Sequence, residues 1–381
     1  MTKLIDITGK ALSGEWGVDD DTGNGTPVIR TTNFTYTGKI DYTNVITRTI
    51  NKKNIAKKFL CKGDIIIEKS GGSDKFPVGR VVFFDGEENK YLFNNFTGLL
   101  RVKDKEKWFP KYVLYSLLSN YNRGGTRKFE NKTTGLHNLK IDDYVNKCNI
   151  RDVDFNHQKD ICNQLDKIDN IICKYKEEQY LLDELVKARF VELFGDPATN
   201  EYNWPMLNLE NVSSIITYGL TVRPTYVNKG IDLISARELH KGFIEYEVAP
   251  KISFNDFQSL SDKGKPLKND ILFSKTGSIG HCALVDTDKM FAITQNAARL
   301  GLIIEKVNPV WLLYYLRMNY IQDWCKRHAK GNAVKDLQLK DIKAIPLFEC
   351  PLELQNQFAY FVKEVDKSRF IIKSMIKEGL L

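Results

Sequence analysis

The 381-residue chain has no long apolar run, and its first residues do not have the pattern of a signal peptide. No apolar stretch approaches the ~20 residues of a membrane-spanning helix. The N-terminal residues MTKLIDITGK lack the apolar region of a signal peptide. We therefore expect a cytoplasmic protein.

Metal-binding and disulfide patterns are also missing. The seven cysteines form no CxxC pair and the five histidines are scattered, so we expect neither a metal site nor a disulfide framework. Cys162 and Cys173 fall within an apolar helical pattern, and we expect both to be buried free thiols.

Sequence motifs of catalysis and nucleotide binding are absent as well. The chain contains no Pro-Pro dipeptide, and so lacks the (N/D)PP(Y/F) tetrapeptide of amino-methyltransferases. It has no GxxxxGK(S/T) segment, and the GNG at 23–25 lacks the third glycine and the preceding strand of a dinucleotide-binding loop. We expect no bound cofactor and no catalytic residues in this chain.

The composition is that of a folded, mildly basic protein. Hydrophobic residues make up 42% of the chain, which is enough for a substantial core. The 56 Lys and Arg residues against 48 Asp and Glu residues give a net charge of +8. This charge is compatible with nucleic-acid binding, but many enzymes are equally basic.

The strongest feature of the sequence is an internal repeat. DIIIEKS (64–70) recurs as DILFSKT (270–276), WFPKYVLYSL (108–117) as NPVWLLYYL (308–316), and HQKDICNQLDKID (157–169) as LQNQFAYFVKEVD (354–366). Between these segments, Gly79, Asp85, Asn95 and Leu99 correspond to Gly280, Asp286, Asn296 and Leu300, and LKIDDY (139–144) corresponds to LQLKDI (337–342). Because the order never changes, we interpret the chain as a tandem duplication of a unit about half its length.

Each repeat predicts the same order of secondary structure. Short strand-like runs broken by Gly, Asn, Asp and Pro come first, a helical pattern follows, and a long amphipathic helix closes the unit. This order predicts an α+β fold.

The two closing helices carry coiled-coil stripes. The first has apolar or aromatic residues at 161, 165, 168, 172, 175, 182 and 186, interrupted by Gln179; the second has Phe358, Val362, Val365, Ile372 and Met375, interrupted by Arg369. Each stripe alone is also typical of a helix packed on its own domain. Their equivalent places in a duplicated chain favour an antiparallel coiled coil with pseudo-twofold symmetry. A helix over 157–190 would be ~50 Å long and could act as a spacer.

The first long helix has a clear predicted end. Gly195 favours a helix C-terminus, and Asp196-Pro197 prevents continuation. We predict a globular unit at 1–152, a central helix at 153–195, a second globular unit at 196–350 and a distal helix at 351–381.

Several strings, together with the duplicated order, resemble one known family. The strings are KGDIIIEKSGGSDKFPVGRV (62–81), KNDILFSKTGSIGHCALV (268–285) and LVKARFVELFGDP (185–197), and a glutamine opens each long helix at Gln158 and Gln355. Over essentially the whole chain, the sequence resembles the specificity (S) subunit of type I restriction–modification enzymes. It departs from the family pattern in its short second helix.

The resemblance implies a non-catalytic DNA-recognition subunit used in phage defence. Each globular unit would be a target recognition domain that reads one half of a bipartite, asymmetric site in double-stranded DNA. The helices would set the gap between the halves and dock two modification (methyltransferase) subunits, which restriction (translocase–nuclease) subunits would join. S-adenosylmethionine, ATP and Mg²⁺ would belong to those partners.

Two segments of each repeat are candidates for DNA contact. The loop after the DII or DIL strand combines a lysine, a hydroxyl and small residues, which suits a phosphate, although a plain turn with a solvated lysine fits equally. The basic loops at 122–134 and 326–336 could line a groove or simply be solvated. The two equivalent asparagines could read adenine or only form turns. The predicted DNA-binding residues are Lys69, Ser70, Arg80, Asn95, Arg123, Arg127, Lys128, Lys275, Thr276, Asn296, Arg327, Lys330 and Lys335.

Two other functions remain open at this stage. Asp74, Glu88 and Lys90 have the D-x13-E-x-K spacing of a nuclease, although Lys289 and Phe291 replace the last two in the second repeat. The alternative function is therefore a stand-alone type II-like nuclease. A third possibility is an interaction protein whose two modules bind protein, for which salt would not alter DNA affinity.

Overall fold

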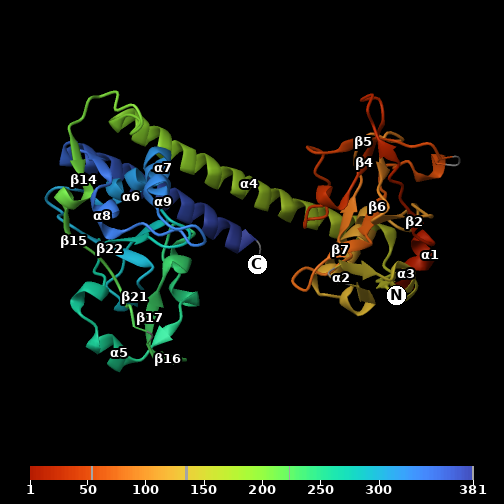
Figure 1. Cartoon of the computed structure of the whole chain (residues 1–381). Coiled ribbons are helices and arrows are strands. Elements are labelled where there is room, and N and C mark those ends of the chain that lie inside the picture. Colours follow the sequence, from red (N-terminus) through yellow and green to blue (C-terminus); the bar gives the residue numbers. More distant parts are fainter. Residues whose placement is uncertain (53–54, 134–135, 223, 380–381) are drawn as a thin grey trace. The chain divides into compact units, whose positions relative to one another are not determined.

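The computed structural model describes residues 1–52, 55–133, 136–222 and 224–379. The chain divides into two compact units, Met1–Ile171 (unit 1) and Ile172–Leu381 (unit 2) (Figure 1). Within the described residues, none of the helices combines the length and apolarity needed to cross a membrane.

Unit 1 consists of small sheets packed against short helices. Its strands form sheets in the orders β2-β10-β6-β8, β3-β5-β4-β9, β11-β12-β7 and β1-β13. Its elements are β1 (Thr2–Lys3), α1 (Leu4–Thr8), β2 (Leu12–Ser13), β3 (Val18–Asp19), β4 (Thr26–Ile29), β5 (Ile46–Thr49), β6 (Ile65–Glu68), β7 (Ser70–Gly72), β8 (Val81–Phe83), β9 (Leu92–Phe93), β10 (Thr97–Leu100), α2 (Pro110–Asn122), β11 (Glu130–Thr133), β12 (Leu136–Leu139), α3 (Ile141–Lys147), β13 (Asn149–Ile150) and the start of α4 (Phe155–Phe194).

Unit 2 repeats much of this design after α4. Its sheets have the orders β15-β22-β19-β20, β16-β18-β17-β21 and β14-β23. Its elements are β14 (Met206–Asn208), β15 (Ser213–Tyr218), β16 (Tyr226–Val227), β17 (Ile231–Ile234), β18 (Lys251–Ile252), α5 (Phe254–Ser259), β19 (Ile271–Ser274), β20 (Cys282–Leu284), β21 (Phe291–Ile293), β22 (Ala297–Leu302), α6 (Pro309–Arg317), α7 (Asn319–His328), α8 (Leu339–Lys343), β23 (Pro346–Phe348) and α9 (Leu352–Gly379).

The sheets confirm the duplication. In both units the DII or DIL strand (β6 or β19) lies between two antiparallel neighbours, β10 and β8 in unit 1 and β22 and β20 in unit 2. Each unit also contains one parallel strand pair, which is β4 with β9 in unit 1 and β17 with β21 in unit 2. The predicted α+β fold of two similar units is therefore confirmed.

The register of the repeat needs one correction. Ile65 pairs with Leu100, and the equivalent Ile271 pairs with Leu300, so Leu300 corresponds to Leu100 and not to Leu99. In the same way Asn296 corresponds to Phe96. The shift arises in the loop before β9, because that connection is one residue longer in unit 1 than its counterpart before β21.

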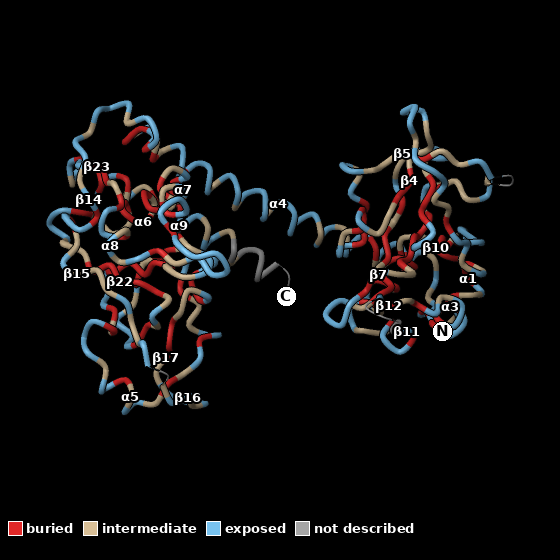
Figure 2. The backbone as a smooth tube through the Cα atoms, viewed as in Figure 1, coloured by how far each residue is buried: buried red, intermediate tan, exposed pale blue. Residues whose placement is uncertain are grey.

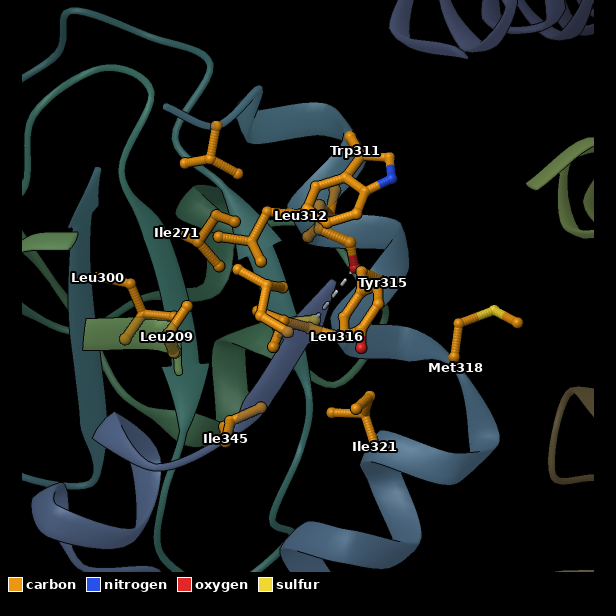
Figure 3. Packing of buried hydrophobic residues seen from close by; sticks show 14 of the residues in the cluster. Leu209, Ile271, Leu300, Trp311, Leu312, Tyr315, Leu316, Met318, Ile321 and Ile345 are labelled. Atoms are coloured by element: carbon orange, nitrogen blue, oxygen red, sulfur yellow. Dashed lines mark hydrogen bonds between the residues drawn. The ribbon is translucent and has the colours of Figure 1, made fainter. Parts of the chain in front are cut away.

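The core of each unit lies between the sheets and the helix that follows them. Figure 2 shows buried residues concentrated in the strands and in α2 and α6, while the middle of α4 is exposed. In unit 2, Trp311, Tyr315 and Leu316 of α6 lie over Ile271 and Leu300 of the sheet (Figure 3). These large apolar side chains are removed from water, which is the main source of stability for such a core.

The two long helices pack antiparallel within unit 2. Phe190 of α4 contacts Phe358 of α9 with ring centroids 5.3 Å apart, and Arg369 of α9 donates to Asp183 of α4 at 2.6 Å. Val186 and Val362 are buried in the same contact. Residues later in α9 thus meet residues earlier in α4, as predicted.

The remaining stripe positions behave differently. Ile161 packs against the core of unit 1 and Val186 is buried in the core of unit 2, whereas Leu165, Ile168 and Ile172 between them are each 37% exposed. The side chain of Met375, another predicted seam residue, lies outside the described residues. Cys162 is buried as predicted, but Cys173 is exposed, because it lies on a face of α4 that packs against nothing in the described chain.

The ends of α4 follow from local chemistry. The helix ends at Phe194 as predicted, and Gly195 has a φ of 78°, which is a conformation that glycine adopts without strain. At its start, the buried Gln158 accepts from the backbone N–H of Phe109 at 2.8 Å. In unit 2 the buried Gln355 accepts from the backbone N–H of Asn308 at the same distance. Each glutamine ties a long helix to the helix that follows the sheets.

Candidate nucleic-acid interface

In each unit the loop after the DII or DIL strand pairs with residues at, or a few positions beyond, the end of the second predicted segment. In unit 1 the backbone carbonyl of Lys69 accepts from the N–H of Leu139 at 2.8 Å, and Ser70 pairs with Asn138. In unit 2 the carbonyl of Lys275 accepts from the N–H of Leu337 at 2.7 Å. The loop after the DII or DIL strand is therefore joined to the segment that leads into α3 or α8.

In each unit the lysine at the start of this loop is also hydrogen-bonded to a turn. The N–H of Lys69 donates to the carbonyl of Phe96 at 2.8 Å, and the N–H of Lys275 donates to the carbonyl of Asn296 at 3.0 Å. A third neighbour is the strand beside β10 or β22, where Ser13 and Tyr218 hold equivalent places opposite Gly98 and Ala298. We call this region the lysine corner. In unit 1 it contains Lys69, Phe96, Ser13 and Asn138, and in unit 2 it contains Lys275, Asn296, Tyr218 and Asp336.

In unit 1 the lysine of the corner donates to a neutral hydroxyl group. The Nζ of Lys69 donates to the Oγ of Ser13 at 2.7 Å. Burial lowers the pKa of Lys69, and the positive charge of Lys58 adds to the effect.

In unit 2 the lysine corner contains a carboxylate. The Nζ of Lys275 donates to Oδ1 of Asp336 at 2.6 Å, and the hydroxyl of Thr276 donates to the same oxygen at 2.5 Å. Desolvation raises the pKa of Asp336, but the two hydrogen bonds and the lysine charge outweigh it and the net shift is downward. Asp336 is therefore ionised at neutral pH, and Lys275 has a counter-ion within the unit.

A pocket of about 490 Å³ opens at this corner of unit 2. It brings together three of the predicted DNA-binding residues. The lining residues are Tyr218, Thr221, Lys275, Thr276, Gln295, Asn296, Val334 and Asp336. Aromatic, amide, carboxylate and ammonium groups thus meet in one cavity, and such groups make base and phosphate contacts in DNA-binding proteins.

The basic loop of unit 1 presents exposed cations. Arg123, Arg127 and Lys128 are all exposed. The guanidinium of Arg127 donates to the backbone carbonyl of Asp74 at 3.2 Å, which joins this loop to the one after β7. Residue 134, at the end of the predicted segment 122–134, lies outside the described residues.

The basic loop of unit 2 is hydrogen-bonded to the lysine corner through its backbone. Arg327, Lys330 and Lys335 are exposed, and Lys330 exchanges two backbone hydrogen bonds with Asp336 at 2.9 and 2.8 Å. The carbonyl of Lys335 accepts from the N–H of Gly277 at 2.8 Å. These bonds place the cations next to the corner.

The side chain of Arg80 is held by hydrogen bonds within unit 1. Its guanidinium donates to both carboxylate oxygens of the buried Glu68, at 3.1 and 2.8 Å. It also donates to the backbone carbonyls of Thr31 and Phe34, both at 3.2 Å. Since these contacts occupy most of its donors inside unit 1, we leave Arg80 out of the proposed interface.

The two predicted asparagines both lie in turns. Asn95 is exposed in a turn closed by the bond from Thr97 N–H to the carbonyl of Asn94, at 3.1 Å. Asn296 lies in the matching turn, closed from Ala297 to Thr294 at 3.2 Å. Turn formation accounts for both asparagines, and their use in reading adenine stays a prediction.

The nuclease-like residues have separate partners. Lys90 donates to Glu87 at 2.7 Å, Glu88 accepts from the backbone N–H of Lys62 at 3.1 Å, and Asp74 lies 3.7 Å from the ring of His137. Within residues 1–52, 55–133, 136–222 and 224–379, no three His, Cys, Asp or Glu side chains cluster as metal ligands would. Nothing in this geometry supports the nuclease alternative.

Sequence reasoning missed four residues of the lysine corners. Ser13 and Tyr218 reach the corner through sheet pairing, which no sequence motif marks. Asn138 and Asp336 stand directly before the matched segments 139–144 and 337–342, so extending the repeat by one residue would have found them.

Comparisons with known proteins agree with this architecture. Residues 222–381 match the family described as the Type I restriction modification DNA specificity domain. The EcoBI specificity subunit of type I restriction enzyme from Escherichia coli is 29% identical over 136 residues, which is 36% of this chain. That match spans 28% of the relative's own length.

Two solved structures share the fold over almost the whole chain. The S subunit of a type I restriction–modification system from M. genitalium has a TM-score of 0.56 at 14% identity, covering 99% of this chain and 91% of that one. A chain from a structure of type I R-M complex assembly and conformational transition has a TM-score of 0.55 at 15% identity, covering 99% and 92%. At such low identity these likenesses establish the fold.

Proposed function

We propose that this chain is a specificity subunit of the type I restriction–modification family and that it recognises a bipartite, asymmetric sequence in double-stranded DNA. The observation that carries the proposal is the lysine corner. The same backbone arrangement occurs twice, with Lys69 and Lys275 at its centre, but the side chains around it differ. A backbone arrangement that occurs twice with different side chains is suited to recognising two half-sites of different sequence.

The exposed cations beside each corner would supply the phosphate contacts. Such contacts position a protein on DNA, whereas base-edge contacts give specificity. In unit 1 they would come from Arg123, Arg127 and Lys128, and in unit 2 from Arg327, Lys330 and Lys335.

We further propose that the chain is a non-catalytic scaffold in the cytoplasm. Two modification subunits would dock on it with restriction subunits joining them, and S-adenosylmethionine, ATP and Mg²⁺ would bind to those partners. The long helices would set the unread gap between the half-sites.

Methylation by the assembled complex tests the proposal. The purified chain alone should neither methylate nor cleave DNA, and addition of the cognate modification subunit should give adenine methylation at one bipartite sequence. Methylation by the isolated chain would overturn the proposal. Metal-dependent cleavage by the isolated chain that disappears in Glu88→Ala would instead establish the nuclease alternative.

A further inference from the structure

The two lysine corners differ in the groups around a constant lysine. Both hold a lysine followed by a hydroxyl residue, Ser70 or Thr276. Where unit 1 has Asn138 before Leu139, unit 2 has Asp336 before Leu337. The corner of unit 2 therefore combines a cation with a carboxylate.

The pair in unit 2 lines the pocket. The side chain of Asp336 is 40% exposed and that of Lys275 is 12% exposed. In the described part of the chain, the hydrogen bonds of the Asp336 carboxylate both end on Oδ1, so Oδ2 can accept from a ligand. The ammonium group has three donors and directs one to Asp336 and a long one to the Oγ of Thr276 at 3.4 Å, which leaves a third donor for a ligand.

We propose that Lys275 and Asp336 together read one G·C base pair in the half-site bound by unit 2. The pair presents a donor, the Nζ of Lys275, beside an acceptor, the Oδ2 of a carboxylate whose other oxygen lies 2.6 Å from that Nζ. In the major groove, guanine offers O6 and N7 as acceptors, and the cytosine N4 amino donor lies beside O6. Lys275 donates to guanine and Asp336 accepts from cytosine.

The same chemistry disfavours the other base pairs. An A·T pair in that orientation puts the adenine amino donor against the lysine and the thymine O4 acceptor against the carboxylate. A T·A pair restores the order of donor and acceptor, but it places the thymine methyl group near the lysine and adenine N7 near the carboxylate. A C·G pair reverses donor and acceptor.

Among its described residues, the lysine corner of unit 1 has no lysine–aspartate pair of this kind. There Lys69 donates to the neutral Ser13, and the position of Asp336 is taken by the amide residue Asn138. The inference thus assigns the G·C requirement to one half-site only, and it rests on the proposed function.

Mapping of methylated sites for the complex with its modification subunit tests the inference. The wild type should show an invariant G·C pair in one half-site. Asp336→Asn should relax the preference at that pair by roughly tenfold or more, and Lys275→Gln should relax the same pair. The other half-site and the gap should not change.

A matched control is Asp288→Asn, which removes another lysine-paired carboxylate of unit 2, 3.0 Å from Lys268. It should leave the whole motif unchanged. Binding of the assembled complex to duplexes with each G·C pair of that half-site replaced by A·T gives a readout that needs no turnover. The wild-type complex should bind more weakly when the G·C pair contacted by Lys275 and Asp336 is replaced by A·T. The Asp336→Asn and Lys275→Gln complexes should bind the original and the replaced duplex equally well.

The outcomes separate the two proposals. A wild-type complex without any site-specific methylation would count against the proposed function. A wild-type complex with a defined motif that keeps every base preference in both corner variants, or in which the two variants relax different pairs, would overturn the G·C reader. If Asp336→Asn prevents folding, Lys275→Gln decides, since an unchanged motif in that variant overturns the inference by itself.

Discussion

The buried side chain of Gln158 accepts a hydrogen bond from the backbone N–H of Phe109, which is the residue directly before helix α2. Its amide nitrogen donates to the carbonyls of Lys107 at 3.0 Å and Val153 at 2.9 Å. One side chain thus satisfies three backbone groups where the sheets, α2 and α4 meet. Gln355 repeats the arrangement in unit 2, with bonds to Asn308 and Cys350.

Replacement of Gln158 should loosen the start of α4. Gln158→Ala leaves one buried N–H and two carbonyls without their partner, and we expect a loss of about 2–4 kcal/mol in the free energy of unfolding. Urea denaturation followed by circular dichroism measures this loss. The control is His157→Ala, an exposed neighbour that should have little effect; equal losses in both variants would contradict the role of the glutamine.

Arg80 should matter for stability and only indirectly for DNA. Arg80→Ala leaves the carboxylate of Glu68 buried without its cation, which should cost about 3–5 kcal/mol. Lys128→Ala, in an exposed position, should leave the melting temperature unchanged but weaken DNA binding by the complex. A normally stable Arg80→Ala chain with a specific loss of DNA binding would show that the arginine contacts DNA.

The aromatic contact between α4 and α9 should stabilise unit 2. Phe190 is fully buried among Phe194, Trp311, Tyr315 and Phe358. Phe190→Ala should lower the free energy of unfolding by about 3–5 kcal/mol. Leu185→Ala, on the same helix but 48% exposed, should change it by much less in the isolated chain. Similar losses for the two variants would show that the aromatic cluster is not specially important.

The exposed basic loops should set the salt dependence of DNA binding. Each phosphate contact contributes about 0.9 to the slope of log affinity against log salt concentration. Alanine at Lys330 or Lys335 should therefore reduce that slope by roughly one without changing the recognised sequence. Alanine at Lys268, which pairs with Asp288 away from the corner, is the control. An unaltered slope in the loop variants would place the phosphate contacts elsewhere.

The Lys275–Asp336 pair should make part of the stability of unit 2 sensitive to acid. The folded-state pKa of Asp336 lies below its ordinary value, so the pair stabilises the fold above about pH 4 and ceases to do so as the pH falls through that lower pKa. Wild type should be more stable than Asp336→Asn at neutral pH, and the difference should shrink in acid. Chemical denaturation at several pH values measures it; a constant difference would indicate that the charge of Asp336 is not involved.

Much of the fold could be predicted because it depends on local patterns. The repeat, the α+β order, the end of α4 at Phe194 and the antiparallel contact of the two long helices all follow from periodicity and helix-stop residues. The exposed Cys173 was mispredicted, since a stripe on a helix does not say how far along the helix a partner extends. The equivalence of Asn95 with Asn296 failed by one residue, because a loop-length difference can be located only from the strand register.

The candidate site was partly accessible from the sequence. Lys69 and Lys275 were found from the repeated strings, and the basic loops from their charge. The sequence could not show that the loop after each strand is joined to the segment that leads into α3 or α8, that Arg80 is bound to Glu68, or that Asp336 is the counter-ion of Lys275.

By itself the sequence determined that two copies of one unit exist, that each ends in an amphipathic helix, and which residues are common to both copies. These properties depend on residues close together in the chain, where spacing decides which side chains share a face. Only the tertiary structure decided which lysine has a carboxylate partner and which has a hydroxyl. Hydrogen bonds and ion pairs act over a few ångströms in space, and Lys275 and Asp336 are brought together by sheet and loop packing although they lie far apart in the chain.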